Sequence, residues 1–426
     1  MKSHPLSFGP RVATGQIDGV SGDRSFACFG NLMLALAVVG YPLSAAVSQL
    51  TEADSNAINL AFRITILVLS LLLGIWTIAR GQYQVDALIL VFLMIYTIRM
   101  VSDLTYSGLP DIKENFQFYM AITLIPTLSL GGGLAWYNEK TFAWWITLIG
   151  GLAGLLIAYT LLFRPDEMLL EALDQRASFK FLNPISIGYH GLYIAAAALI
   201  LIAILGKRRW ILLLGAVTVL GGYLLLVSGS RGPIVALVLG VGLTGFANTR
   251  TAGAYAIIGL GVAALLMVVG APELIIQRFF SIGADASSLE RFYATQLSLQ
   301  AAIDHPLFGF AYIEPVTGLY PHNLLVEAAM ALGMAGAALM LWMQIRLIVA
   351  AWWLAQRGDR LLPFIAASVF ANSWISGSIW GAGLFFAVLW TARGRVRFLS
   401  SQPQHNRHML RSAQGSQPLR QLMRGG

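Results

Sequence analysis

The chain has 426 residues, of which 57% are hydrophobic and only 11% charged, and its formal net charge is +8. Soluble proteins carry about 25% charged residues to cover their surface, so this composition excludes a soluble globular class. Apolar runs of about 20 residues, the length that crosses a bilayer core, recur along most of the chain. A membrane β-barrel would show alternation in segments of about 10 residues, and this pattern does not occur. We therefore predict an all-α polytopic membrane protein.

About twelve membrane spans are expected. The span at 324–355 exceeds the length of one crossing, so part of it should tilt or extend beyond the membrane. The last two spans are short and are joined by SGSIWGAG; we prefer two crossings there, and one crossing with a re-entrant segment is the alternative. The expected ranges are 27–48, 57–79, 85–101, 116–137, 142–163, 186–206, 210–229, 232–248, 253–271, 324–355, 361–376 and 379–392.

Basic residues fall on alternate connections and acidic residues on the others, which places both termini in the cytoplasm. The first span is expected to act as an uncleaved signal anchor. The basic C-terminal tail is interpreted as an anchor to anionic lipid, and nucleic-acid binding is not expected. The predicted units are a cytoplasmic tail at 1–26, nine spans within 27–271, a partly helical outer loop at 272–323, three spans within 324–392 and a basic cytoplasmic tail at 393–426.

The first candidate site is the sequence SGSRG, Ser228–Gly232, at a short outer junction between two spans. Pro233 follows it and fits the first turn of the next helix. The turn presents backbone N–H groups beside the guanidinium of Arg231, and this combination suits an anion. The alternative is an arginine that extends to the membrane interface without a function.

A second candidate is Arg291, in the long outer loop. SSLE at Ser287–Glu290 fits a capping box, and the spacing predicts a helix from about Ser288 to Ile303 that stops before His305-Pro306. Arg291 lies on a small, polar side of this helix; the alternative is a solvated residue paired with Glu290. The polar side also carries Ala294, Thr295, Ser298 and Ala302, and the opposite, apolar side carries Leu289, Phe292, Tyr293 and Leu297.

The third candidate is the stretch YPHNLLVEAAMALGMAG, which leads into the tenth span. Asn323 is a natural N-cap for the helix that follows. His322 titrates near neutral pH and is a candidate proton acceptor. Glu327 is an acid at membrane depth, where acids are rare and often functional. We expect Glu327 to orient His322 or to pair with an arginine.

Other ionisable residues carry less weight. His190 is expected to pack in the core, and Arg63 and Arg99 to extend from span ends on the outer side. Asp103 could line an entry for an acceptor. The sequence contains no zinc-ligand cluster, Walker loop or nucleophile elbow, so neither a metal nor another cofactor is expected.

These motifs resemble the O-antigen ligase and O-antigen polymerase superfamily of bacterial membrane glycan transferases. The resemblance rests on SGSRG at Ser228–Gly232 and on an arginine helix followed by Pro-x-x-Gly, through Arg291, Pro306 and Gly309. It also rests on the spacing of His322, Asn323, Gly333 and Gly336, and the expected span number agrees. The motif-bearing stretch runs from Val227 to Gly336.

The resemblance implies a glycosyltransferase in the bacterial inner membrane whose active site faces the periplasm. It would transfer a glycan from undecaprenyl diphosphate to an acceptor hydroxyl with inversion and without a metal. Arg231 and Arg291, with Ser230, would bind the diphosphate, His322 would accept or position the acceptor proton, and Asn323 and Glu327 would support them. Only thirty residues separate Arg291 from His322, fewer than expected for a lipopolysaccharide ligase.

The acceptor therefore stays open between lipid A–core, in a ligase, and a growing O-antigen, capsule or exopolysaccharide chain, in a polymerase. Membrane lipids are the other expected partners. The competing function is a transporter or flippase that moves the lipid-linked glycan without covalent chemistry. The scarcity of charge within the spans, the folded outer loop and the lack of clear internal repeats favour the transferase.

Overall fold

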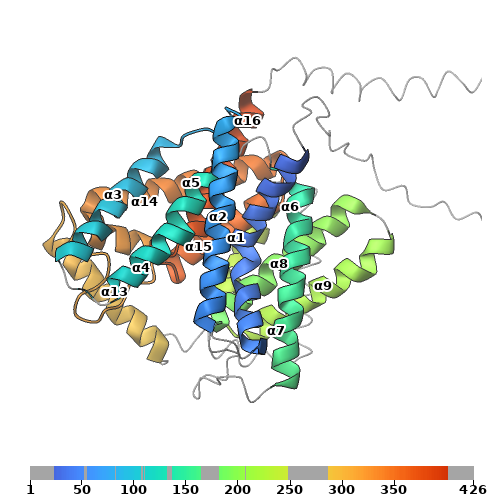
Figure 1. Ribbon diagram of the computed structural model, residues 1–426, viewed down its shortest axis with the longest axis horizontal. Helices are drawn as coiled ribbons and strands as arrows, with labels where there is room; N and C mark the ends of the chain where they lie inside the picture. The colour runs from blue at the N-terminus through green and yellow to red at the C-terminus, as the bar shows by residue number, and fades with distance from the viewer. Residues whose placement is uncertain are drawn as a thin grey trace, which may run out of the picture.

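The computed structural model describes residues 24–51, 55–81, 83–106, 109, 111–131, 137–164, 182–206, 208–247 and 286–401. The regular elements of these residues are helices, as the composition predicts (Figure 1). Within these described ranges, seven helices are long and apolar enough to cross a membrane, and two shorter apolar helices accompany them. Each predicted span apart from 253–271 coincides with a helix or with consecutive helices. That span and the first part of the predicted outer loop lie outside the described residues.

The helices divide the described chain as follows: α1 Arg24–Thr51, α2 Ser55–Ala79, α3 Ala87–Tyr106, α4 Ile112–Phe118, η1 Tyr119–Leu124, α5 Ile125–Gly131, α6 Glu139–Trp145, η2 Ile146–Gly150, α7 Gly151–Phe163, α8 Pro184–Leu205, α9 Arg208–Val227, α10 Arg231–Ala247, α13 Ala286–Asp304, α14 Leu324–Gln356, α15 Leu361–Ile375 and α16 Gly383–Ser401. The π-helical segments η1 and η2 join α4 to α5 and α6 to α7 without a break.

Local sequence explains where the central helix α8 begins and ends. The side chain of Asn183 accepts a hydrogen bond from the amide of Ser186, and Pro184 occupies the first turn, where its missing N–H costs nothing. Gly206 closes the helix in the left-handed conformation, with φ of 57°. His190 lies buried on α8, where its Nε2 is 2.9 Å from the carbonyl oxygen of Gly150, so the predicted core position is confirmed.

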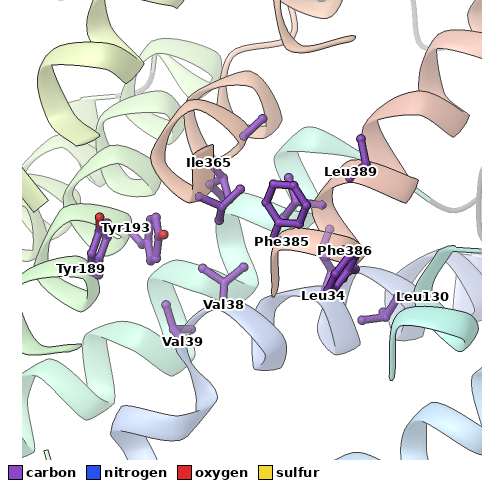
Figure 2. Packing of buried hydrophobic residues seen from close by; sticks show 14 of the residues in the cluster. Leu34, Val38, Val39, Leu130, Tyr189, Tyr193, Ile365, Phe385, Phe386 and Leu389 are labelled. Atoms are coloured by element: carbon purple, nitrogen blue, oxygen red, sulfur yellow. The ribbon is translucent and has the colours of Figure 1, made fainter. Parts of the chain in front are cut away.

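The core sits where α1, α8, α15 and α16 pack together. Figure 2 shows Val38 of α1 between Tyr193 of α8 and Phe385 of α16, with Ile365 of α15 above them. These side chains are buried almost completely. Because lipid is as apolar as the side chains, close packing rather than the hydrophobic effect holds such helices together. The paired glycines Gly191 and Gly221 let α8 and α9 approach until their backbones touch.

The long helix α14 is kinked at Gly333, whose φ of 73° and ψ of −170° interrupt the helix. The turn after α13 enters this kink: the amide of Met334 donates to the carbonyl of Pro306 (2.8 Å), and the amide of Phe310 donates to the carbonyl of Met330 (2.6 Å). A side chain at Gly309 would lie 2.3 Å from the backbone of α14, so only glycine fits. The Pro-x-x-Gly motif and the Gly-x-x-Gly motif thus pack against each other.

At the opposite end of the bundle, α16 continues beyond the predicted start of the C-terminal tail. Its residues Arg393 and Arg397 pair with Asp86, at 2.6 and 3.0 Å. Glu139, at the start of α6, accepts hydrogen bonds from the amides of Arg360 and Leu361 at the start of α15. The first basic residues of the predicted tail are therefore part of the folded bundle as far as Ser401.

Candidate functional site

Arg231 is the first residue of α10, directly after the turn that joins α9 to α10. In this turn Gly229 is left-handed, with φ of 56°, and the amide of Ser230 donates to Ser228 Oγ (3.3 Å). A side chain at Gly188 of α8 would lie 2.6 Å from Ser228 Oγ, so the turn packs directly on that helix. The SGSRG motif therefore forms a tight, buried turn that fixes the start of α10.

The segments that carry the two predicted arginines meet at the C-terminal end of α15. Arg291 Nη1 donates a hydrogen bond to the carbonyl oxygen of Ile375, the last residue of α15, at 3.2 Å. From the other side, Gly232 lies so close to α15 that an added Cβ would be 3.9 Å from Ile375 Cγ2. Helix C-termini carry partial negative charge, which stabilises guanidinium groups placed there. Arg231 and Arg291 thus belong to segments that pack on the same residue.

His322 lies next to Arg291 and has an unusual backbone. Its φ is 54°, in the left-handed region that side chains rarely adopt. Burial lowers the pKa of His322 to about 4, and the positive charge of Arg291 contributes to the shift. Within the described part of the chain its buried Nδ1 has no hydrogen-bond partner. The imidazole is therefore neutral at physiological pH.

Hydrogen bonds of its two chain neighbours, Pro321 and Asn323, tie the His322 segment to α13 and to α15. Asn323 caps α14 as predicted, since its Oδ1 accepts from the amides of Leu325 (2.9 Å) and Val326 (3.3 Å). Its Nδ2 donates to the carbonyl of Trp374 on α15 at 3.4 Å. Thr295 of α13 donates to the carbonyl of Pro321 at 3.0 Å. The three predicted site regions thus come together, although 90 residues separate Arg231 from His322 in the sequence.

Glu327 has different partners from those expected. Its carboxylate is fully buried and accepts hydrogen bonds from the hydroxyl of Tyr96 and from the amide of Ile379, both at 2.9 Å. The expected contact with His322 or an arginine is not among these bonds. Glu327 instead holds the connection between α15 and α16 against α3 and α14. Sequence reasoning recognised that an acid at this depth has a role but could not identify its partners.

An aromatic cluster that the sequence did not reveal adjoins His322. The ring of Tyr320 lies 4.2 Å from the imidazole and 5.9 Å from the ring of Trp380, which meets Phe118 at 5.4 Å. The guanidinium of Arg63 lies 4.7 Å from the centre of the Phe118 ring. Among the described residues, the buried Nε1 of Trp380 has no hydrogen-bond acceptor. The only signal in the sequence was a tryptophan in the SGSIWGAG connection.

The side chain of Arg99 points into the protein and holds the turn that follows α13. Its guanidinium donates to the carbonyl oxygens of Phe308 (2.7 Å), Phe310 (3.0 Å) and Ala331 (2.8 Å). Asp103 pairs with Arg99 at 3.5 Å, and it accepts from the amide of Tyr312 at 2.9 Å. Both residues therefore fasten the turn after α13 to α3 and α14.

The fold and the site together define a multi-span helical membrane protein with two arginines and a neutral histidine at helix ends. Residues 216–341 match the family model described as O-Antigen ligase. This match supports the resemblance to the O-antigen ligase and polymerase superfamily that the motifs predicted. The match covers the three motif regions, and it indicates a glycosyltransferase-like enzyme. Among the curated proteins, none matches this chain.

Proposed function

We propose that the protein transfers a glycan from undecaprenyl diphosphate to an acceptor hydroxyl, with inversion, on the periplasmic side of the inner membrane. The observation that carries this proposal is the gathering of the Arg231, Arg291 and His322 regions around the end of α15. All three lie within the segment that matches the O-antigen ligase family model. The acceptor is a sugar hydroxyl of lipid A–core or of a growing polysaccharide chain.

The diphosphate is the leaving group, and Arg231 and Arg291 bind it. Its negative charge increases as the bond to the anomeric carbon breaks. Guanidinium groups stay charged at any working pH and make paired hydrogen bonds to phosphate oxygens. Groups fixed in place before the reaction stabilise this charge more in the transition state than in the ground state. A diphosphate leaves readily, so no acid is needed to protonate it.

The acceptor alcohol is the weaker reactant and needs a base. His322 fills this role because its imidazole is neutral at physiological pH and so has a free ring lone pair that can accept a proton. The proton passes from the acceptor oxygen to a ring nitrogen as that oxygen bonds to the anomeric carbon and the diphosphate departs from the opposite side. A single displacement of this kind inverts the anomeric centre.

The aromatic cluster beside His322 suits a sugar ring. Tyr320 and Trp380 lie edge to face, with their ring planes at 84°, and both are partly exposed. Aromatic faces accept the apolar C–H surface of a pyranose. These rings would hold the acceptor with its reacting oxygen next to His322.

The test is transfer by the purified, reconstituted protein. Undecaprenyl-diphosphate glycan is supplied with either lipid A–core or a second lipid-linked repeat, and both release of the lipid diphosphate and the glycan product are measured. Release that depends on one acceptor supports transfer and separates ligase from polymerase. Movement of the intact lipid-linked glycan across the bilayer, with no covalent product from either acceptor, would contradict the proposal.

A further inference from the structure

The helix α13 packs on the protein through its small residues and turns large apolar residues outward. Ala294, Ser298 and Ala302 are buried, and Ala302 packs against Ala329 and Ala337 of α14. At 3.6 residues per turn, Phe292, Leu299 and Ile303 fall on one outward flank. Phe292 is 63% exposed and Ile303 is 70% exposed. A helix surrounded by water would show the reverse arrangement.

The apolar flank continues into the turn after α13. Leu307 is 74% exposed and Phe308 is 81% exposed. We call this set the α13 apolar surface; it consists of Phe292, Leu299, Ile303, Leu307, Phe308 and Phe310. Contiguous exposed patches of this kind mark a site of contact with a membrane or another molecule. The opposite flank carries the exposed acids Glu290 and Asp304 beside Tyr293 and Leu297, so the exposed acidic groups of the helix lie on this flank alone.

Hydrogen bonds to α3 fix the depth of this surface. Arg99 holds the carbonyls of Phe308 and Phe310. It lies within the apolar span Ala87–Thr105, six residues before its end. At about 1.5 Å per residue, the turn therefore contacts α3 roughly 9 Å inside the end of the apolar span. The turn is thus placed at the depth of the bilayer, not beyond it.

The α13 apolar surface adjoins exposed apolar residues on two of the predicted membrane spans. On α3, Ile98 is next to Arg99 and is largely exposed, as is Met94 one turn earlier. On α14, Met334 is largely exposed, and its amide binds the carbonyl of Pro306, which directly precedes Leu307. Figure 1 shows α3, α13 and α14 together at one edge of the bundle. The apolar turn thus extends the lipid-facing surface of both spans.

We propose that the α13 apolar surface is embedded in the bilayer, where acyl chains of the membrane lipids cover it. An amphipathic helix with this distribution lies in the plane of the membrane interface, with its apolar side among the acyl chains and its charges in the headgroups. Arg291 is part of the same helix, so this placement holds its guanidinium at the depth of lipid phosphates. A lipid-borne phosphate then reaches Arg291 sideways from the leaflet.

The test measures lipid contact directly and needs no activity, so it stands apart from the proposed transfer. The single cysteine, Cys28, is replaced by alanine, and cysteines are introduced one at a time through Phe292→Cys, Phe308→Cys, Ile98→Cys and Asp304→Cys. Each is labelled with a bimane fluorophore, and the protein is placed in nanodiscs of phosphatidylethanolamine and phosphatidylglycerol. Quenching is then compared between discs with and without brominated acyl chains.

Ile98, on the exposed face of a predicted span, is the control for full lipid contact, and Asp304, on the acidic flank, is the control for water. Bromine should quench the labels at Phe292 and Phe308 about as strongly as the label at Ile98, and at least about threefold more than the label at Asp304. Weaker quenching at both positions would mean that something other than lipid covers the surface and would overturn the proposal. The label at position 292 lies in α13 and the label at position 308 lies in the turn after it. A local misfolding caused by one substitution would therefore not affect both measurements.

Discussion

The carboxylate of Glu327 accepts a hydrogen bond of 2.9 Å from the hydroxyl of Tyr96, although 231 positions separate the two residues in the chain. Its second oxygen accepts from the amide of Ile379. This fully buried pair joins α3 to α14 and holds the segment that presents Trp380 to the site. The pair thus links the first part of the chain to the part that matches the O-antigen ligase family.

We expect Tyr96→Phe to destabilise the protein by about 1–3 kcal/mol, because the buried carboxylate loses one of its two donors. The measurement is thermal unfolding in detergent, combined with Glu327→Leu, which removes the acceptor, in a double-mutant cycle. Coupling between the two changes should be clearly above the error of the method. Additive effects would show that the bond contributes nothing to stability.

Arg291 is expected to act through both charge and geometry. Arg291→Ala should lower the transfer rate by about 100-fold or more, as for loss of a positioned donor to developing charge. Arg291→Lys retains the charge but loses the fork of N–H groups, so it should recover only part of the rate. The measurement is release of undecaprenyl diphosphate. Arg357→Ala, a change at the far end of α14, is the control and should leave the rate intact.

His322 should confer a specific pH dependence on the reaction. Its pKa is lowered to about 4 by burial and by the charge of Arg291. The neutral, proton-accepting form therefore persists across neutral pH, and the rate should be flat between about pH 6 and pH 8. The rate should fall only as the pH approaches 4, where the imidazole becomes protonated. His322→Ala should abolish transfer across the whole range, while the protein stays folded in the membrane.

The control for His322→Ala is His305→Tyr. This variant keeps a ring stacked on Phe310 and should retain the wild-type rate and pH dependence. A wild-type rate in His322→Ala would show that His322 is not the base of the reaction. A loss of activity centred near pH 6.5, the ordinary pKa of histidine, would show that the imidazole is not shielded as the structure indicates.

Gly333 allows the kink in α14 that receives the turn after α13. Gly333→Ala should destabilise the protein by about 1–3 kcal/mol, because φ of 73° and ψ of −170° suit glycine alone. The added methyl group would also lie 2.5 Å from the carbonyl oxygen of Pro306. The comparison is Gly215→Ala on α9, where an added Cβ meets nothing within 4 Å. Equal melting temperatures for the two variants would contradict this account.

Trp380 is expected to bind the acceptor without taking part in bond breaking. Trp380→Phe keeps an aromatic face and should raise KM for the acceptor only modestly. Trp380→Ala removes the face and should raise this KM by about tenfold, while the rate at saturating acceptor changes little. Steady-state transfer at several acceptor concentrations separates the two constants. A fall in the maximal rate with an unchanged KM would assign Trp380 a different role.

The sequence by itself determined the helical membrane class, because runs of about 20 apolar residues have no other stable arrangement in lipid. It also identified local features that short-range bonds set, such as Asn323 as the cap of α14 and the helix that carries Arg291. The family resemblance rested on motifs within one stretch of the chain, and the match at residues 216–341 confirmed it. Each of these features depends on neighbours along the chain.

Only the tertiary structure decided how these pieces meet. Arg99 resembled an arginine at a span end, yet its guanidinium holds three backbone carbonyls of the turn after α13 and of α14. Glu327 resembled a partner for His322, yet its bonds go to Tyr96 and Ile379. In the sequence Trp380 was only a tryptophan in the SGSIWGAG connection, and the structure placed its ring beside Tyr320 and His322. Hydropathy specifies which segments enter the membrane, but the partners of a buried polar group depend on contacts between helices that are distant in the sequence.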